Sequence, residues 1–498
     1  MTARRRLSAG RSASAAALAA LLLGALAASP AEATMVISSQ TTKNVSCKNG
    51  VCTATRHFAV LNAGDLAGML AAGDVTVVPG TRALDIDIKV PLSWASASRL
   101  TLDAYHSILI DRTLTVTGSG ALTMTTNDGG SGGDLFFNGM GRAIFWDLAS
   151  SLIINGTAYT LVGDIATLAS GIAAHPTHSF ALANNYDAGV DGTYGSSPIP
   201  TTFFGKFDGL GNTISNLTMS TSSGPLALFL DARNRLADIR MTHAHAANTS
   251  ANPGSTAILA VSGRLMIGDT VTGTVSAACC DAAGLVASMN SGTVTRSWAN
   301  VRITGTANNA GGLVGEAGNG AFIMFSHADG DVTGANNVGG LVGLTGFIGA
   351  DAAITQDFAT GKVSGAIAGG LIGYSEGHAQ NSYATGAVSG GTVGGFLGRN
   401  DFYWPDRNYA IGHVEGTSLA GGFSGCNQTN ETDNYWDTDT AGVTLADGGN
   451  CSDGGDLPVG LTTAQFQSGL PNGFDPAIWA EDPSINNGFP YLIANPPQ

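Results

Sequence analysis

The sequence predicts an all-β protein: a right-handed parallel β-helix with coils of about 28 residues and a cap at each end. The first observation is a short Gly-Leu-Val-Gly phrase that recurs from residue 284. Successive copies of its apolar second residue are 28, 28, 30, 25 and 27 positions apart, at Leu285, Leu313, Leu341, Leu371, Phe396 and Phe423. A period of this size is typical of a solenoid, in which a unit buries its apolar face only when neighbours stack on it.

A second column of residues repeats with the first. It is weighted toward aromatic side chains, at Trp298, His327, Phe358, Tyr383, Tyr409 and Tyr435. In the first five copies a β-branched residue follows five positions later, at Ile303, Val332, Val363, Val388 and Val414. Stacked coils place equivalent residues ~4.8 Å apart, so we expect an aromatic ladder. A propeller is the alternative, but its blades need about 40–50 residues each, which is more than one repeat supplies.

Paired glycines precede each Leu-Val-Gly phrase, as in Gly339-Gly340 and Gly369-Gly370. Glycine adopts positive φ without a steric penalty, so we expect these pairs to form tight corners in the left-handed region.

Residues 1–33 are expected to be an export signal. Four arginines lie before residue 12, an apolar run covers 15–28, and Ala31-Glu32-Ala33 gives a small-x-small cleavage pattern. The mature chain would begin at Thr34, and its charge would change from 22 − 37 = −15 to 18 − 36 = −18. So acidic a chain disfavours nucleic acid and anionic membranes as partners. No later stretch predicts a membrane span, so we expect an exported protein at the cell surface or outside the cell, with the periplasm as the alternative.

The six cysteines suit an oxidising compartment. Cys47 and Cys52 flank an Asn-Gly turn, and a disulfide there would contribute ~2 kcal/mol. Cys426 and Cys451 bracket a Gly-rich segment, and bridging them would contribute ~3–4 kcal/mol. For the adjacent Cys279 and Cys280 we expect two buried thiols rather than a vicinal disulfide. No zinc site is predicted, because no C-x-x-C or H-x-x-x-H pair occurs.

Composition divides the rest of the chain into five regions: a polar leader (34–57), a β-rich segment (58–200), irregular coils (201–281), regular repeats (282–442) and a C-terminal cap (443–498). Within the second region, residues 84–90 alternate apolar and charged side chains. Period two places Leu84, Ile86, Ile88 and Val90 on one face, and Asp85, Asp87 and Lys89 in solvent. Short helical turns are expected at 65–70 and 165–168.

Length variation in the repeats is concentrated in one turn, which follows the Leu-Val-Gly phrase. Insertions in repeat proteins gather on one face, and that face often binds ligands. The turn at 399–407 contains the most recognition-like run, Asp401-Phe402-Tyr403-Trp404-Pro405, since aromatic rings stack readily on sugar rings. A hydrophobic plug over the stack is the alternative. The candidate binding residues are Tyr374, Arg399, Phe402, Tyr403, Trp404 and Arg407.

No catalytic residue is predicted. Gly373-Tyr374-Ser375-Glu376-Gly377 matches a nucleophile elbow, but Ser375 occupies the repeat position of Ala317, Thr345 and Asn400. Asp437 and Asp439 begin like a calcium loop, although the closing Glu is replaced by Gly448. A solvated polar cap is the preferred interpretation of this segment, and a weak calcium site at Asp437 and Asp439 is the alternative.

The repeat phrases resemble the GLUG motif, which occurs in filamentous-haemagglutinin-like adhesins and some bacterial immunoglobulin A peptidases. The residues closest to its usual wording are 341–343 and 381–390, with similar flanking segments at 207–217, 434–437, 460–466 and 488–492. Residues 84–162, especially 100–108, resemble a haemagglutinin-type passenger. The resemblance implies a secreted or surface scaffold with no defined catalytic residues, although no N-terminal secretion domain of that type is recognisable.

The sequence therefore predicts an exported, non-enzymatic β-helix that acts as an adhesin and binds carbohydrate or another cell surface. A polysaccharide-active lyase or hydrolase is the first alternative, and a purely structural passenger is the second. A cluster of carboxylates with a basic residue on one face would favour the enzyme. The sequence makes no prediction of oligomeric state.

Overall fold

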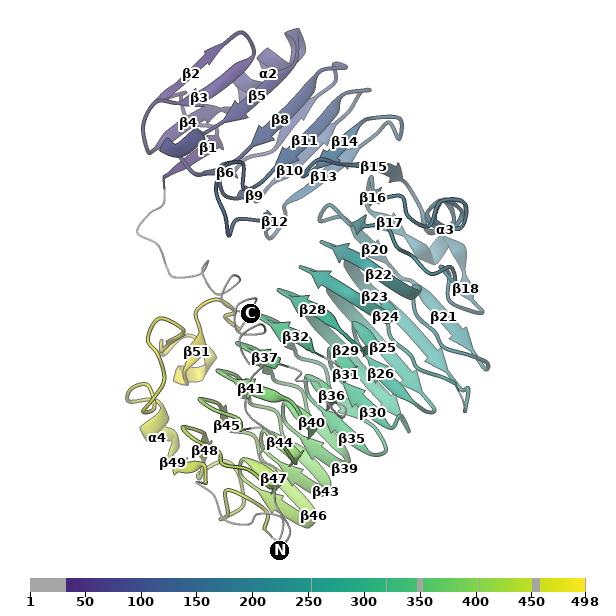
Figure 1. Ribbon diagram of the computed structural model, residues 1–498, viewed down its shortest axis with the longest axis vertical. Helices are drawn as coiled ribbons and strands as arrows, with labels where there is room; N and C mark the ends of the chain where they lie inside the picture. Colours follow the sequence, from purple (N-terminus) through teal and green to yellow (C-terminus); the bar gives the residue numbers. More distant parts are fainter. Residues whose placement is uncertain are drawn as a thin grey trace, which may run out of the picture.

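The structure is a computed structural model that describes residues 33–251, 253–318, 320–346, 353–402, 404–449 and 457–497. It is nearly all β and forms a β-solenoid of about 15 turns with ~28-residue coils, which confirms the predicted fold class. Parallel strand pairs join each coil to the next. Figure 1 shows two stacks of coils that meet at an elbow. Residues 1–32 of the expected export signal lie outside the described residues.

The first stack has its own apolar core, whose residues lie between Met35 and Leu210 in the sequence. Helix α2 (Ala63–Ala72) closes its open end, because Leu66 and Leu70 are fully buried against the first coil. Asn62 caps this helix by accepting the backbone N–H groups of Gly64 and Asp65. The other elements of this stack are β1 (Thr34–Ser38), β2 (Val45–Lys48), β3 (Val51–Ala54), β4 (Ala59–Asn62), β5 (Val75–Val78), η1 (Gly80–Arg82), β6 (Asp85–Ile88), β7 (Leu92–Trp94), β8 (Arg99–Asp103), β9 (Ile108–Ile110), β10 (Thr113–Val116), β11 (Ala121–Thr125), β12 (Leu135–Phe137), β13 (Arg142–Phe145) and β14 (Leu152–Ile154).

The alternating run at 84–90 contains β6, and the prediction for its polar face was wrong for the two aspartates, whereas Lys89 is exposed as expected. Ile86 and Ile88 are buried as expected, but Asp85 and Asp87 are also only 6% and 8% exposed. Strand β6 lies between β1 and β9, so neighbouring coils cover its outer face. Asp85 accepts hydrogen bonds from the backbone of Ser107 and pairs with His106 one coil further on, while Asp87 pairs with Lys89. Period two predicts the face of a side chain but does not reveal what stacks beside it.

The structure confirms the first predicted disulfide and contradicts the prediction for the second cysteine pair. Of the third pair it describes only one cysteine. Cys47 and Cys52 are bonded across the β2–β3 hairpin, as predicted. Cys279 and Cys280 form a vicinal disulfide and are partly exposed, so the expected pair of buried thiols was wrong. Cys280 adopts a φ of 65°, which brings the two neighbouring side chains together in a turn. Cys426 is disulfide-bonded, and Cys451 lies outside the described residues.

The elbow arises where strand direction reverses. Strand β15 (Thr157–Val162) pairs antiparallel with β14 around the turn Asn155-Gly156, both in positive φ. Beyond it, helix α3 (Ile165–Ala174) covers the start of the second core. The guanidinium group of Arg240 donates to the carbonyl oxygens of Phe137, Gly139 and Gly141, so the second stack also contacts the first directly.

The second stack begins with irregular coils, as expected for residues 201–281, and its strands range from two to nine residues in length. These are β16 (Phe180–Leu182), β17 (Tyr186–Asp187), η2 (Ala188–Asp191), β18 (Thr193–Tyr194), β19 (Phe207–Asp208), β20 (Thr213–Ser215), β21 (Thr218–Thr221), β22 (Phe229–Ala237), β23 (Arg240–Asn248), β24 (Ala260–Ile267), β25 (Thr270–Ala277) and β26 (Asp281–Ala283).

The regular repeats follow, in the register that the sequence predicts. The Leu column is continuous through backbone hydrogen bonds such as Leu341 N–H to the Leu371 carbonyl oxygen. The β-branched column is in register from Ile303 to Val414. Their strands are β27 (Val286–Met289), β28 (Gly292–Thr295), β29 (Trp298–Gly305), β30 (Asn309–Gly311), β31 (Val314–Ala317), β32 (Ala321–Met324), β33 (His327–Ala328), β34 (Val332–Thr333), β35 (Asn337–Gly339), β36 (Val342–Thr345), β37 (Ala353–Thr355), β38 (Phe358–Ala359), β39 (Val363–Gly369), β40 (Ile372–Ser375), β41 (His378–Gln380), β42 (Tyr383–Ala384), β43 (Val388–Gly394), β44 (Leu397–Asn400), β45 (Tyr409–Ala410), β46 (Val414–Gly421) and β47 (Ser424–Asn427).

The paired glycines have a different role from the one predicted. None of Gly339, Gly340, Gly369 and Gly370 has a positive φ. Instead, a Cβ atom on Gly340 would lie 2.1 Å from the Gly370 carbonyl oxygen, and one on Gly370 would lie 2.0 Å from that of Gly395. Glycine is required here because successive backbones approach too closely for any side chain.

The aromatic column forms the predicted ladder. Adjacent rings from His327 to Tyr409 stack with centroids 4.4–5.0 Å apart and nearly parallel planes. The following residues, Ala328, Ala359 and Ala384, point into the coil core, so the ladder stands on the outside of the stack.

The C-terminal segment lies over this ladder instead of covering only the end of the stack (Figure 1). Trp479 contacts the rings of Tyr383 and Tyr409, and Asn495 donates to the carbonyl oxygens of Ser326 and Gln356, several coils back. We call residues 457–497 the C-terminal strap. The last elements are β48 (Tyr435–Asp437), β49 (Val459–Leu461), α4 (Thr463–Phe466), β50 (Trp479–Ala480), η3 (Asn486–Gly488) and β51 (Tyr491–Leu492).

A buried polar ladder runs beside the aromatic one, and the sequence analysis missed it. Each member's side-chain oxygen accepts a backbone N–H from the preceding coil, as when Asn434 Oδ1 accepts Asn408 N–H at 3.0 Å. Backbone groups at this corner are thereby satisfied by side chains. The ladder consists of Asp269, Ser297, Ser326, Asp357, Ser382, Asn408 and Asn434.

One ladder member should make stability depend on pH. Burial raises the pKa of Asp269 to about 8. Because the folded chain then holds a proton that the unfolded chain releases near pH 4, the free energy of unfolding should fall as pH rises from about 4 to about 8, by up to ~1.4 kcal/mol per pH unit.

Asp269→Asn keeps an acceptor for the Ile239 N–H and should remove this loss of stability. Thermal unfolding at pH 5 and pH 8 tests it, with exposed Asp74→Asn as control. Parallel pH profiles for wild type and Asp269→Asn would contradict the prediction.

Candidate functional site

The predicted binding residues Tyr374 and Arg399 lie in register on β40 and β44, on the outside of the stack. The Arg399 guanidinium carbon lies 5.6 Å from the centroid of the Tyr374 ring. Arg399 donates two hydrogen bonds to the Asp401 carboxylate, at 2.8 and 3.0 Å, and the Tyr374 hydroxyl donates a third at 2.7 Å. Partial burial, with Asp401 and Glu376, raises the pKa of the Tyr374 hydroxyl, so it remains a donor. These contacts fix the base of the turn that follows.

Two aromatic side chains stand on that turn. Phe402 is 65% exposed and Trp404 is 62% exposed, which excludes a buried plug for these two. Tyr403 lies outside the described residues. At the other end of the turn, Arg407 pairs with the adjacent Asp406, and Asp406 also pairs with His378 in the preceding coil. Burial alone would raise the pKa of Asp406, but hydrogen bonding from His378 and the charge of Arg407 outweigh it and lower the pKa.

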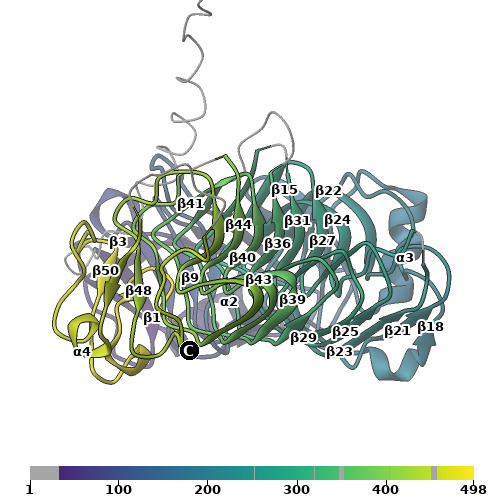
Figure 2. The same cartoon turned by 90° about the horizontal axis from the view of Figure 1, so that it is seen from below.

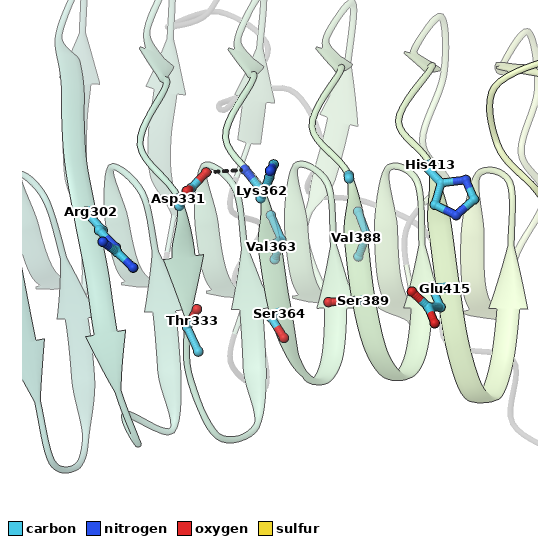
Figure 3. A pocket seen from close by; sticks show the side chains of 11 residues that line it. Arg302, Asp331, Thr333, Lys362, Val363, Ser364, Val388, Ser389, His413 and Glu415 are labelled. Carbon is cyan, nitrogen blue, oxygen red and sulfur yellow. Dashed lines mark hydrogen bonds between the residues drawn. The ribbon is translucent and has the colours of Figure 1, made fainter.

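A second feature, which sequence reasoning missed, is an open groove of about 400 Å³ along the side of the second stack (Figure 3). It crosses β29, β34, β39, β43 and β46, one strand from each of five successive coils. Arg302 lies at one end, and His413 and Glu415 lie at the other. Asp331 accepts the backbone N–H of Lys362 at 2.9 Å between them. The lining residues are Arg302, Asp331, Thr333, Lys362, Val363, Ser364, Ala387, Val388, Ser389, His413 and Glu415.

The groove follows directly from the repeat register. Arg302, Asp331, Lys362 and His413 immediately precede a residue of the buried β-branched column, and Thr333, Ser364, Ser389 and Glu415 immediately follow one. Alternation therefore turns both columns outward. The signal is present in the sequence as polar residues on either side of each β-branched residue of the column, and the regular spacing of the apolar positions alone does not reveal it. Arg302 and Lys362 have no ion-pair partner within the part of the chain that the structure describes.

The turn and the groove lie on opposite sides of the coil. Viewed from the end in Figure 2, β41 and β44 run along one side and β29 runs along the other. A single small ligand therefore cannot touch both, and each is a separate candidate.

The remaining sequence motifs form no catalytic arrangement. Ser375 is 1% exposed, lies in register with Thr345 and Asn400 as predicted, and bonds to Thr345 and Gly377. Asp437 accepts the Thr463 hydroxyl at 2.6 Å and Asp439 accepts the Thr463 N–H at 3.0 Å, so both anchor α4. Across the described ranges no group of three or more His, Cys, Asp or Glu side chains is placed to hold a metal ion.

No family model matches the chain, and no curated protein matches it. A solved structure of a putative immunoglobulin A1 protease from Bacteroides ovatus is similar, with a TM-score of 0.38 and 17% identity over 67% of this chain and 92% of that chain. No helix within the described ranges is long and apolar enough to cross a membrane. By its own geometry the chain is a β-solenoid.

Proposed function

We propose that this protein is an exported, non-enzymatic surface or matrix adhesin that binds carbohydrate through the turn at 399–407. The observation that carries the proposal is the pair of exposed aromatic side chains, Phe402 and Trp404, on a turn with a fixed base. The resemblance of the repeats to GLUG-motif adhesins agrees with it.

The chemistry of the turn suits a sugar. Exposed aromatic faces offer flat apolar surface for the C–H side of a pyranose ring, and aromatic side chains lose little conformational entropy on binding. The neighbouring Arg399–Asp401 pair provides charged hydrogen-bonding groups for ring hydroxyls, and it is already oriented before any ligand arrives. Solvent currently covers the two rings, so burying them would contribute favourably to binding.

A second candidate is a polysaccharide-active enzyme that uses the groove. The groove places two carboxylates and two cations on one face, which is the feature expected of such an enzyme. However, the strands that carry Asp331 and Glu415 are three coil steps apart, ~14 Å. Paired carboxylates in glycosidases lie within about 9.5 Å of each other, so this spacing disfavours a two-carboxylate hydrolase and leaves a lyase as the enzymatic alternative.

One experiment separates these functions. The purified mature chain is incubated with bacterial, plant and host polysaccharides, and both retention and released fragments are measured in the same tubes. The double variant Phe402→Ala/Trp404→Ala should lose retention at least about tenfold. The expected size follows from stacking of a flat ring on an aromatic side chain, which contributes ~1–3 kcal/mol per contact for nucleobases. The thermal stability of the variant should not change. Trp146→Ala, at another exposed tryptophan, is the matched control.

The outcomes are distinct. Retention without fragments, abolished only in the double variant, supports the adhesin. Fragments that disappear in Lys362→Gln support the enzyme and overturn the adhesin. Neither retention nor fragments would leave the structural passenger as the remaining function.

A further inference from the structure

A second pocket, of about 350 Å³, lies on the outside of the second stack and is lined by Arg233, Asn234, Arg264, Leu265, Gly292 and Thr293. We propose that it binds the carboxylate or sulfate group of an acidic sugar unit, so that the carbohydrate ligand is an anionic glycan. This inference rests on the proposed function and adds the chemical class of the ligand.

The first step is the register of two arginines. Strands β22 and β24 pair in parallel, with Ala232 opposite Gly263 and Arg235 opposite Leu265. The register shift between these pairs places Arg233 and Asn234 together opposite Arg264. Two guanidinium groups therefore project from adjacent coils, whose backbones are ~4.8 Å apart. Like charges in neighbouring strands repel, and an anion between them would remove that repulsion.

The second step is the set of hydrogen bonds and ion pairs that each arginine already makes. Nε of Arg233 donates to the Asp231 carboxylate at 2.8 Å, and Thr202 holds the same carboxylate. This contact uses Nε and leaves the two terminal nitrogens of Arg233 directed elsewhere. Arg264 is exposed and has no carboxylate partner within the described ranges. Asp231 balances the charge of Arg233, so Arg264 leaves the pocket with a net charge of +1. The formal net charge of the whole chain is −15.

The third step is the next coil, beside Arg264. Gly292, in that coil, has a φ of 122°, and a Cβ atom there would lie 1.8 Å from the Arg264 carbonyl oxygen. The two backbones are therefore in contact here, and Gly292 adds no side chain to the pocket. Thr293 adds a hydroxyl at the edge, which can donate to a sugar oxygen or to the acid group. Guanidinium groups are well suited to carboxylates and sulfates, because their N–H donors match two acceptor oxygens.

The position of the pocket links it to the aromatic turn. Strands β24, β27, β31, β36, β40 and β44 pair in succession, so the turn after β27 and the turn after β44 share one edge of the stack. Figure 1 shows β28, β32, β37 and β41 following one another along this side. Five coil steps, ~24 Å, separate Arg264 from the aromatic turn. Phe204, 53% exposed, lies in the coil before Arg233, and Asn234 donates to its carbonyl oxygen. The pocket therefore lies one coil away from an exposed aromatic residue.

The test uses two pairs of matched probes: oligogalacturonate with its methyl ester, and a sulfated galactan with its unsulfated form. Binding to the full mature chain is measured by calorimetry at low and high salt. Arg264→Gln should weaken binding of an acidic probe about tenfold or more, because charge-assisted hydrogen bonds contribute ~1.5–3 kcal/mol. Arg82→Gln removes the same charge from an exposed position in the first stack and should have no effect. The acidic probe that binds identifies carboxylate or sulfate as the recognised group.

Each outcome decides the proposal. Preference for the acidic probe, lost in Arg264→Gln and retained in Arg82→Gln, supports it. Equal binding of charged and uncharged probes, or equal loss in both variants, overturns it. Binding of uncharged glycan that depends on Phe402 and Trp404 but not on Arg264 overturns the anion site and leaves the adhesin standing. Absence of binding to every glycan overturns both.

Discussion

Replacing Trp479 by alanine is expected to lower the free energy of unfolding by ~3–5 kcal/mol, the usual effect of deleting a buried tryptophan. Trp479 is 1% exposed and its ring stacks on Phe474 at 4.6 Å. It also packs against Tyr383 and Tyr409, and its indole N–H donates to Asn381 at 3.3 Å. Removing the ring opens a cavity between the C-terminal strap and the aromatic ladder.

Denaturant unfolding of wild type and Trp479→Ala measures the effect. Trp146→Ala is the control, since that side chain is 68% exposed and should change stability by less than ~0.5 kcal/mol. Hydrogen exchange adds a local readout, because loosening of the strap should raise exchange in the strap before the rest of the second stack. Equal stability of Trp479→Ala and Trp146→Ala would contradict the packing described above.

Replacing Arg235 by methionine is expected to cost ~3–5 kcal/mol, because it leaves buried carboxylates without their cation. Arg235 contacts Asp208 at 2.9 Å and Asp238 at 3.8 Å, and those two side chains are 0% and 8% exposed. Burial raises the pKa of Asp238 well above its usual value even with Arg235 present. Both carboxylates have only Arg235 as an ion-pair partner among the described residues.

The experiment compares Arg235→Met with Arg233→Met, two positions away on the same strand but exposed. Urea unfolding should separate the two by several kcal/mol. Adding Asp208→Asn to Arg235→Met should restore part of the loss, because it removes one of the stranded charges. A change below ~1 kcal/mol for Arg235→Met, or no recovery in the double variant, would show that the cluster is not held by this cation.

Much of the fold could be predicted because the repeat fixes register. A constant step from aromatic to β-branched residue aligns Tyr383 with Tyr409, and Val388 with Val414, whatever the intervening turn contains. The elbow could not be predicted in the same way, because Asn155-Gly156 indicates a hairpin but not that the coil stack changes direction there. The burial of Asp85 depends on a residue one coil away, which local alternation does not contain.

The candidate site was predicted in part. The variable turn, with Tyr374 beside Arg399, lies on one edge as the length variation indicated. The Arg233–Arg264 pocket was not predicted, because it lies among irregular coils where a register shift brings the two residues together. The binding role of the turn stays a prediction until the variants are measured.

The C-terminal strap changes how the solenoid can come apart. In a linear array of coils each unit touches only its neighbours, so the last coil can fray alone and the array melts progressively. The strap instead joins distant coils, since Asn495 contacts Ser326 while Tyr435 contacts Asn472. Fraying of the last coil would therefore require the strap to detach from several coils at once. This half of the molecule should therefore melt as one cooperative unit.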